Sequence, residues 1–267
     1  MPSLYQAAKA VVPRSIRETV RNTWDLRVKP ALRMLANPDA QSPSMREARN
    51  NLVAELKMEQ VVSDAAAKFA AFKGKKNLKL HLGAGTDIRR GWVNIDLSWQ
   101  TPPSVIDSDA GTVFINYDLR RRLPLESGSC ELVYSSHFFE HLEYRHGLAL
   151  LAECYRVLQA GGVFRISLPN FKGLFKAYLA GDHDYVGLID IYAELPDLEA
   201  GTDLLVDHVN YGVYQNGEHK CIYDEQKILL LLKRLGYTSV CESAFKPGVD
   251  PDNTIRRKYS FYVEAVK

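Results

Sequence analysis

Residues 78–96 read LKLHLGAGTDIRRGWVNID, and this stretch decides the fold of the chain. One apolar run ends abruptly in the tripeptide GAG at residues 83–85, and a second, at residues 92–95, ends in Asp96. Small residues at the end of a strand let a ligand approach the backbone, and free N–H groups there suit polar or anionic groups. An acid at the end of the next parallel strand is placed to accept both hydroxyls of a ribose. The two strand ends therefore predict a nucleoside cofactor.

The composition is that of a soluble globular protein, with 46% hydrophobic and 25% charged residues in a chain of 267. That length holds one α/β domain of ordinary size plus an extension or insertion. No apolar run approaches the roughly 20 residues of a membrane span, and the N-terminus lacks the pattern of a secretory signal. The four cysteines (Cys130, Cys154, Cys221 and Cys241) form no C-x-x-C pair, so reduced thiols and a cytoplasmic protein are expected.

Residues 1–76 form a basic extension with 14 Lys and Arg against 7 Asp and Glu, whereas the remaining residues carry 20 against 25. Proline-broken helices are predicted up to about Ala36, then a linker over Asn37–Pro43 and a helix from Ser44 to Lys73. A basic arm can bind an anionic membrane surface, and the apolar stripe of the last helix must cover the body or another subunit. A solvated helical face is the first interpretation of these charges, and peripheral association with the inner face of the membrane or a homodimer is the alternative.

From residue 77 onward strands alternate with helices, which predicts one α/β domain over residues 77–267. We expect a seven-stranded, mostly parallel sheet with helices on both faces. The last two strands should form an antiparallel hairpin at the sheet edge, because no helix is predicted between them. The predicted strands are Leu78–Leu82, Trp92–Ile95, Val113–Asn116, Cys130–Ser135, Val163–Leu168, Ser239–Phe245 and Tyr259–Val266; the predicted helices are about Phe138–Leu158 and Asp224–Leu235. The segment of about 170–222 lacks strand periodicity, which is typical of a lid or a substrate-recognition insertion.

Three motifs occur in order along this domain: LHLGAGTDIRRGWVNID, FFEHLEYRHGLALLAECYRVLQAGGVFRISLPN and GEHKCIYDEQKILLLLKRLGYTSV. Together they resemble the class I, Rossmann-like S-adenosylmethionine-dependent methyltransferases. The similarity is to the compact branch with the signature "LGCG…GW.N.D" followed by "EHL…RVLK.GG". The resemblance covers about residues 77–267 and leaves the first 76 residues aside. A Gly-x-Gly pattern alone would be a weak signal, whereas the ordered set of motifs is specific.

The resemblance implies S-adenosyl-L-methionine as the cofactor and places its contacts residue by residue. The loop of Gly83, Ala84 and Gly85 would lie against the methionine part and the ribose of the cofactor. Asp96 would hold the ribose hydroxyls, and Leu97 would pack on the adenine. Only ten residues separate Gly85 from Asp96, so this connection should be a turn and a loop rather than a full crossover helix.

Further cofactor contacts implied by the resemblance lie at the ends of the other central strands. Asp118 would accept the adenine amino group, and Leu119 would add a backbone contact. Ser135 and Ser136 lie where the family places the reactive methyl group. His81 stands where the family often has an acid that binds the amino group of the cofactor, so His81 is the cofactor-side candidate at that position.

Histidines are the candidates for catalysis, because a hydroxyl acceptor must lose its proton during methyl transfer and histidine suits that step near neutral pH. We predict His219, His141 and His137 as catalytic residues, with His208 as a further candidate in the insertion. The EHL motif that contains His141 occurs in family members with different acceptors, so a structural or cofactor-side role is the alternative for His141.

The resemblance implies an enzyme, a methyltransferase with a small-molecule or glycan acceptor. The leading expectation is O-methylation of a sugar hydroxyl in cell-surface polysaccharide biosynthesis. The alternatives are an N- or C-methyltransferase of a small secondary metabolite and a non-catalytic partner protein of the same fold. The acidic body and the lack of a base-flipping motif argue against a nucleic-acid partner. No metal ion is expected, because Asp203, Asp207 and Glu218 offer carboxylates at unspecific spacing.

Overall fold

The computed structural model describes residues 65–97, 111–187, 191–194, 198, 201 and 203–267 of the chain. The chain divides into two compact units, Met1–Gln60 and Val61–Lys267, and every described residue belongs to the second. The broken helices, the linker and the start of the helix predicted within residues 4–64 lie outside the described residues. No helix in the described part of the chain is long and apolar enough to cross a membrane.

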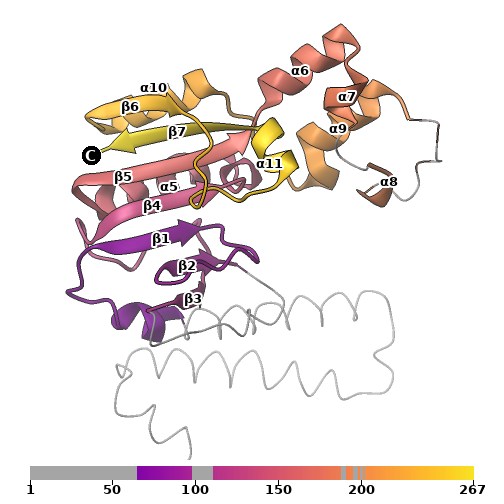
Figure 1. Ribbon diagram of the computed structural model, residues 1–267. Coiled ribbons are helices and arrows are strands. Elements are labelled where there is room, and N and C mark those ends of the chain that lie inside the picture. Colours follow the sequence, from indigo (N-terminus) through magenta and orange to yellow (C-terminus); the bar gives the residue numbers. More distant parts are fainter. Residues whose placement is uncertain (1–64, 98–110, 188–190, 195–197, 199–200, 202) are drawn as a thin grey trace, which may run out of the picture. The chain divides into compact units, whose positions relative to one another are not determined.

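Seven strands form one sheet in the order β3-β2-β1-β4-β5-β7-β6 (Figure 1). The strands are β1 (Leu78–Leu82), β2 (Val93–Asp96), β3 (Val113–Asn116), β4 (Cys130–Ser136), β5 (Leu158–Pro169), β6 (Ser239–Ser243) and β7 (Ser260–Val266). Strands β1 to β5 pair in parallel, and β7 runs antiparallel to both β5 and β6. The predicted mostly parallel sheet with an antiparallel C-terminal hairpin is confirmed.

The described helices lie between these strands, and several of them begin or end at a residue typical of a helix cap. They are η2 (Phe139–His141), α5 (Tyr144–Val157), α6 (Phe171–Ala180), α7 (His183–Val186), α8 (Ile191–Glu194), α9 (Leu205–Tyr214), η3 (Gln215–Gly217), α10 (Glu225–Leu235) and α11 (Thr254–Tyr259). Helix α10, for example, begins where the Asp224 carboxylate accepts the Lys227 N–H at 2.8 Å, and it ends at Gly236 with a φ of 97°. An earlier helix covers residues 65–70 and is followed by a turn over residues 71–74, so the helix predicted to run to Lys73 ends three residues sooner.

Two connections differ from the sequence-based expectation. The single helix predicted over Phe138–Leu158 is split into η2 and α5, because Leu142 leaves the helical conformation with a ψ of 139°. The tight bonding of η2, in which the Leu142 N–H donates to the Phe139 carbonyl at 3.1 Å, does not continue into α5. Strands β6 and β7 are joined by α11, a helix too short to show as an apolar period in the sequence.

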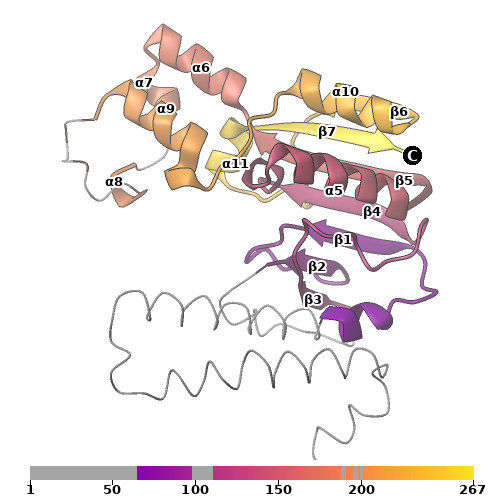
Figure 2. The same ribbon diagram turned by 180° about the vertical axis from the view of Figure 1, so that it is seen from behind.

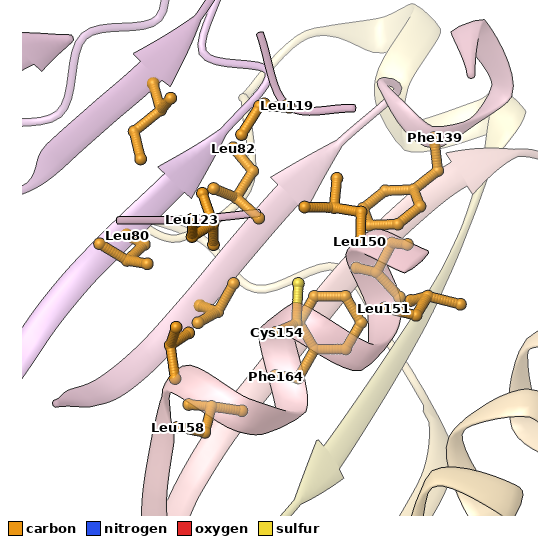
Figure 3. Close-up of a cluster of buried hydrophobic side chains, with 14 of the residues drawn as sticks. Leu80, Leu82, Leu119, Leu123, Phe139, Leu150, Leu151, Cys154, Leu158 and Phe164 are labelled. Atoms are coloured by element: carbon orange, nitrogen blue, oxygen red, sulfur yellow. The ribbon is translucent and has the colours of Figure 1, made fainter. Parts of the chain in front are cut away.

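One face of the sheet carries the hydrophobic core, which Figure 3 shows in close-up. Leu80 and Leu82 of β1 are fully buried there and pack with α5, whose Leu151 and Cys154 have no exposed surface. Helix α10 lies beside α5 on the same face (Figure 2). Truncating one such leucine to alanine typically costs about 2–5 kcal/mol, so this face supplies much of the stability that holds the strand ends in place.

The opposite face of the sheet carries a row of polar side chains, in contrast to the apolar core face. His81 of β1 lies in register with Asn94 of β2 and Tyr134 of β4, and Tyr134 lies in register with Arg165 of β5. The described residues cover this face with a loop, residues 244–253, rather than with a long helix (Figure 1). The expectation of helices on both faces therefore holds for one face of the described part. The ten residues between Gly85 and Asp96 contain no helix, as their number predicts.

The insertion after β5 is helical and has a small core of its own. Phe171, Leu174 and Ala177 of α6 are buried together with Val186 of α7, and Val209 of α9 packs against them. Helices α6, α7 and α9 lie beyond the carboxyl ends of the parallel strands in both views (Figures 1 and 2). Parallel α/β sheets bind ligands outside this end of their strands, so the insertion stands beside the region where a functional site is expected.

Candidate functional site

The loop after β1 places two glycines in the left-handed region for different reasons. Gly83 has a φ of 68°, and a Cβ atom there would lie 2.2 Å from the Phe138 ring. Gly85 has a φ of 51°, and a Cβ atom there would meet nothing within 4 Å. Gly83 is therefore required by the close approach of Phe138, whereas Gly85 borders open space in which a ligand could approach the backbone.

The Asp96 carboxylate ties this loop to the end of β2. One of its oxygens accepts the Gly85 N–H at 2.6 Å, and the other accepts the Leu97 N–H at 2.6 Å. Each carboxylate oxygen has two lone pairs, so the half-buried Asp96 keeps acceptor capacity beyond these two amides. An acid with spare acceptors beside an open glycine fits the ribose of a nucleoside, as the sequence predicts.

Asp118 has a partner within its own turn. Its carboxylate accepts two hydrogen bonds from the Arg120 guanidinium, each at 2.8 Å, and one from the Arg120 N–H at 3.0 Å. These bonds with Arg120 hold the pKa of the Asp118 carboxyl below its usual range, against the opposing effect of burial. Leu119 is 3% exposed and belongs to the hydrophobic core. Asp118 and Leu119 thus shape the turn after β3, and their adenine contacts stay a prediction.

The remaining predicted cofactor contacts are side chains that hold the sheet together. The hydroxyl of Ser135 donates to the Leu82 carbonyl at 3.0 Å, and Ser136 accepts the Ser167 hydroxyl at 2.8 Å. His81 is 1% exposed and lies on the polar face of the sheet. Burial, together with the nearby charge of Arg89, lowers the pKa of His81 to about 4. The cofactor roles of these three predicted residues stay predictions.

A cavity of about 560 Å³ lies at the carboxyl ends of β4 and β5, between η2, the insertion and α11. We call it the histidine cavity. Its lining includes His137, Glu140, His141, Phe171, Glu194, His208, Tyr211, Gln215, His219 and Arg256. The three histidines predicted to be catalytic therefore meet in one cavity, although two of them precede the insertion and the third lies at its end.

His219 has a defined tautomer in this cavity. Its Nδ1 lies 3.1 Å from the Gly212 carbonyl and 3.2 Å from the Val213 carbonyl, so Nδ1 carries the proton and donates it. The neutral imidazole then has its lone pair on Nε2, where it can accept a proton or bind a metal ion. The His219 ring meets the His141 ring edge-on, with centroids 4.9 Å apart. Burial lowers the pKa of both imidazoles.

Glu140 is the acid of the EHL motif and is fully buried at the wall of the histidine cavity. Neither carboxylate oxygen has a hydrogen-bond partner among the residues that the structure describes. Nδ1 of His137 lies 3.6 Å from one of these oxygens. Burial raises the pKa of the Glu140 carboxyl to about 8. The sequence names Glu140 within a motif, but its complete burial depends on contacts with distant residues and could not be read from the pattern.

His137 and His208 also line the histidine cavity, and each has a polar partner of its own. His137 has a φ of 48°, and its Nε2 lies 2.7 Å from the Ser260 hydroxyl of β7. His208 of α9 pairs through Nε2 with Asp203 at 2.9 Å. Asp207, which was also considered as a carboxylate ligand, instead accepts the Leu204 N–H at the start of α9. Asp203 and Asp207 thus hold the insertion together.

The glycine loop with Asp96 and the histidine cavity lie at the same edge of the sheet, because β1, β2, β4 and β5 are parallel and their carboxyl ends meet there. The predicted nucleoside contacts at β1 and β2 and the cavity at β4 and β5 therefore share one edge of the sheet, where parallel α/β sheets bind ligands.

Comparison with known proteins gives one match to a family model and several similar solved structures. Residues 83–166 match the family model described as a methyltransferase domain. No curated protein sequence matches the chain. A S-adenosylmethionine-dependent methyltransferase structure from Archaeoglobus fulgidus is similar at 15% identity and a TM-score of 0.44, over 80% of this chain and 93% of that one. One from Mesorhizobium loti is similar at 16% identity and a TM-score of 0.43, over 72% and 92%.

The matched segment spans the glycine loop, Asp96, η2 with its EHL motif, α5 and most of β5. Over these residues the chain is therefore similar to the methyltransferase family, and they lie within a Rossmann-like, mostly parallel sheet. The cofactor of this family is S-adenosylmethionine.

Proposed function

We propose that the protein is an enzyme that transfers a methyl group from S-adenosylmethionine to a hydroxyl oxygen of a small polyhydroxylated acceptor. The observation that carries this proposal is the histidine cavity of about 560 Å³ at the carboxyl ends of β4 and β5. A cavity of this size suits one or two sugar rings rather than a macromolecule.

In this proposal the protein acts mainly by holding the cofactor and the acceptor in position. The bound cofactor provides an electrophilic methyl carbon, whose bond to sulfur breaks as its bond to the acceptor oxygen forms. Gly85 and Asp96 hold the nucleoside, and the cavity wall orients the acceptor, because such a displacement needs the reacting atoms close and collinear. The hydroxyl proton must also leave, and we propose that His141 and His219 line the part of the cavity in which that hydroxyl lies.

The far wall of the histidine cavity supports a sugar-like acceptor. It presents a carboxylate, an amide, a phenol and a guanidinium, from Glu194, Gln215, Tyr211 and Arg256. Such mixed donors and acceptors suit a ring with several hydroxyls, and tyrosine offers both an apolar face and a hydroxyl. The same proposal includes a role in cell-surface polysaccharide biosynthesis. It also includes two roles for the basic extension, which are attachment to the inner face of the membrane and formation of a homodimer.

The test is a product screen with the full chain. We expect a methylated product, seen by mass spectrometry, with sugars, nucleotide sugars or lipid-linked glycans, and fragmentation should place the methyl group on oxygen. Methylation on nitrogen or carbon of a small metabolite would favour the alternative acceptor class instead. If calorimetry detects no binding of the cofactor or of its demethylated product, the chain is a non-catalytic partner protein and the proposal fails.

A further inference from the structure

Three side chains of the histidine cavity bring possible metal ligands together. One ligand atom each from Glu140, His141 and His219 lie within 4.8 Å of one another. Backbone bonds fix the two chain segments side by side, because the Lys220 and Cys221 N–H groups donate to the Glu140 carbonyl at 2.7 and 3.1 Å. The cluster is thus built by the fold rather than by chance contacts of mobile surface side chains.

The carboxylate of Glu140 points to a positively charged ligand. It is fully buried, and neither oxygen has a hydrogen-bond partner among the described residues. An unpaired buried carboxylate is costly, so such a group either takes up a proton or meets a counter-charge or a metal ion. Nδ1 of His137 lies 3.6 Å from one of the two oxygens, which is beyond hydrogen-bond distance. Glu140 therefore has acceptor capacity directed at the neighbouring imidazoles.

His219 has the hydrogen-bond pattern of a metal-binding histidine. Its Nδ1–H is held by the carbonyls of Gly212 and Val213, which leaves the lone pair on Nε2. Metal-ligating histidines almost always donate their other ring N–H to a carboxylate, a backbone carbonyl or water, and this bond fixes the ring orientation. The imidazole of His141, edge-on to His219, completes the set.

We infer that Glu140, His141 and His219 bind one divalent transition-metal ion and that this ion holds the acceptor oxygen in the histidine cavity. Two imidazoles and one carboxylate suit zinc, manganese or cobalt, whereas magnesium and calcium prefer oxygen ligands throughout. Three protein ligands leave a position open for a further oxygen, as in catalytic zinc sites. The carboxylates considered from the sequence, Asp203, Asp207 and Glu218, are not part of this set.

The cation site stands on its own geometry, whereas its role toward the acceptor rests on the proposed function. The full-length protein, stripped with a chelator, should bind Zn²⁺ with a stoichiometry of one ion per chain in calorimetry. Co²⁺ should produce a visible absorption band of a nitrogen- and oxygen-ligated ion. The variants Glu140→Gln, His141→Gln and His219→Gln should each weaken Zn²⁺ binding by at least about tenfold. Glu143→Gln and His183→Gln, at exposed positions outside the cluster, are the matched controls and should bind as the unaltered chain does.

Circular dichroism and thermal melting of each variant separate loss of the site from loss of the fold, and Glu140→Gln keeps the shape of the side chain. Equal Zn²⁺ binding by the folded cluster variants and the controls, or no binding by the unaltered chain, would overturn the site. Cation binding without methyl transfer to any acceptor would support the site while the proposed function fails. Methyl transfer at full rate in the chelator-stripped protein would overturn the role of the ion in holding the acceptor.

Discussion

Gly83 and Gly85 look alike in the sequence, but the structure gives them separate roles. Any side chain at either position pays for a positive φ, at about 1–2 kcal/mol. At Gly83 a Cβ atom would also overlap the Phe138 ring at 2.2 Å, whereas at Gly85 it would enter open space. We expect Gly83→Ala to lower the free energy of unfolding by about 1–3 kcal/mol more than Gly85→Ala. Urea denaturation checks this difference, and equal losses would show that Phe138 does not require a glycine.

Asp96 provides the second prediction at the scale of single residues. Asp96→Asn keeps the shape of the side chain but replaces one acceptor oxygen with a donor, so a ribose hydroxyl pair loses part of its binding site. We expect the affinity for S-adenosylmethionine to fall by about 1–3 kcal/mol, the usual cost of leaving a buried polar group unsatisfied. Calorimetry with the cofactor measures this. An unchanged dissociation constant would remove Asp96 from the ribose site.

His81 makes the stability of the fold depend on pH. Its pKa is lowered from the ordinary 6.5 to about 4 in the folded chain, chiefly by burial. Between these two values the unfolded chain binds a proton that the folded chain does not, so the free energy of unfolding must fall as the pH falls from about 6.5 to about 4. The loss amounts to about 3 kcal/mol at most.

His81→Gln should flatten this acid-side slope, as measured by urea denaturation at pH values from 4 to 7. The exposed His183→Gln is the control and should keep the slope of the unaltered chain. If His81→Gln shows the same slope as the control, another group is responsible for the acid lability.

The sequence alone identifies those site residues whose type carries the chemistry. The glycine loop, Asp96 and the three histidines follow from residue type and position, and the structure gathers His137, His141 and His219 in one cavity. The sequence could not single out Glu140 as a site residue, because its importance comes from its complete burial beside Lys220 and Cys221 at the end of the insertion. Nor could the sequence show that Asp118 pairs with Arg120, since an acid before three arginines is equally a solvated turn.

At the scale of elements, the loop that covers the polar face of the sheet depends on one buried ion pair. Arg165 of β5 is 1% exposed and donates to both oxygens of Asp250, and through a further nitrogen to Glu264 at 3.0 Å. Removing one member of a buried pair leaves the other charge uncompensated, which typically costs about 3–5 kcal/mol. The pair therefore fixes residues 244–253 and, through them, the start of α11 at the histidine cavity.

A double-mutant cycle tests this connection. Arg165→Met and Asp250→Leu should each lower the free energy of unfolding by about 3–5 kcal/mol, and the double variant by clearly less than the sum. Chemical denaturation gives the three values. Additive losses would mean that the two side chains act independently and that the pair does not anchor the loop.

The elements also show where sequence periodicity reaches its limit. The sequence predicts all seven strands, because each strand is a short apolar run with defined ends. The insertion was recognised only as a segment without strands, because its helices α7 and α8 have four residues each and cannot show an apolar period. The break between η2 and α5 was missed for a related reason, since both sides of Leu142 have helix-forming residues.

At the scale of the whole described unit, the core and the site use opposite properties of the same strands. The apolar face packs against α5 and α10, and this rigid layer aligns the carboxyl ends of β1, β2, β4 and β5. The glycine loop and Asp96, where we expect the cofactor crevice, lie at the first pair of strands, and the histidine cavity lies at the second pair together with the insertion. In the function that we propose, the choice of acceptor depends on the inserted helices.

The division also yields a prediction for the molecule as a whole. A ligand at 100 times its dissociation constant stabilises the folded state by about 2.7 kcal/mol, so saturating S-adenosylmethionine should raise the melting temperature of the unaltered chain. His219→Gln should keep this rise, because His219 belongs to the cavity and not to the crevice, yet it should lose most of its methyl-transfer rate. Thermal melts with and without cofactor, alongside turnover measurements, test both parts. If His219→Gln also loses the cofactor-induced rise, the crevice and the cavity form a single binding unit and the two-part description of the site is wrong.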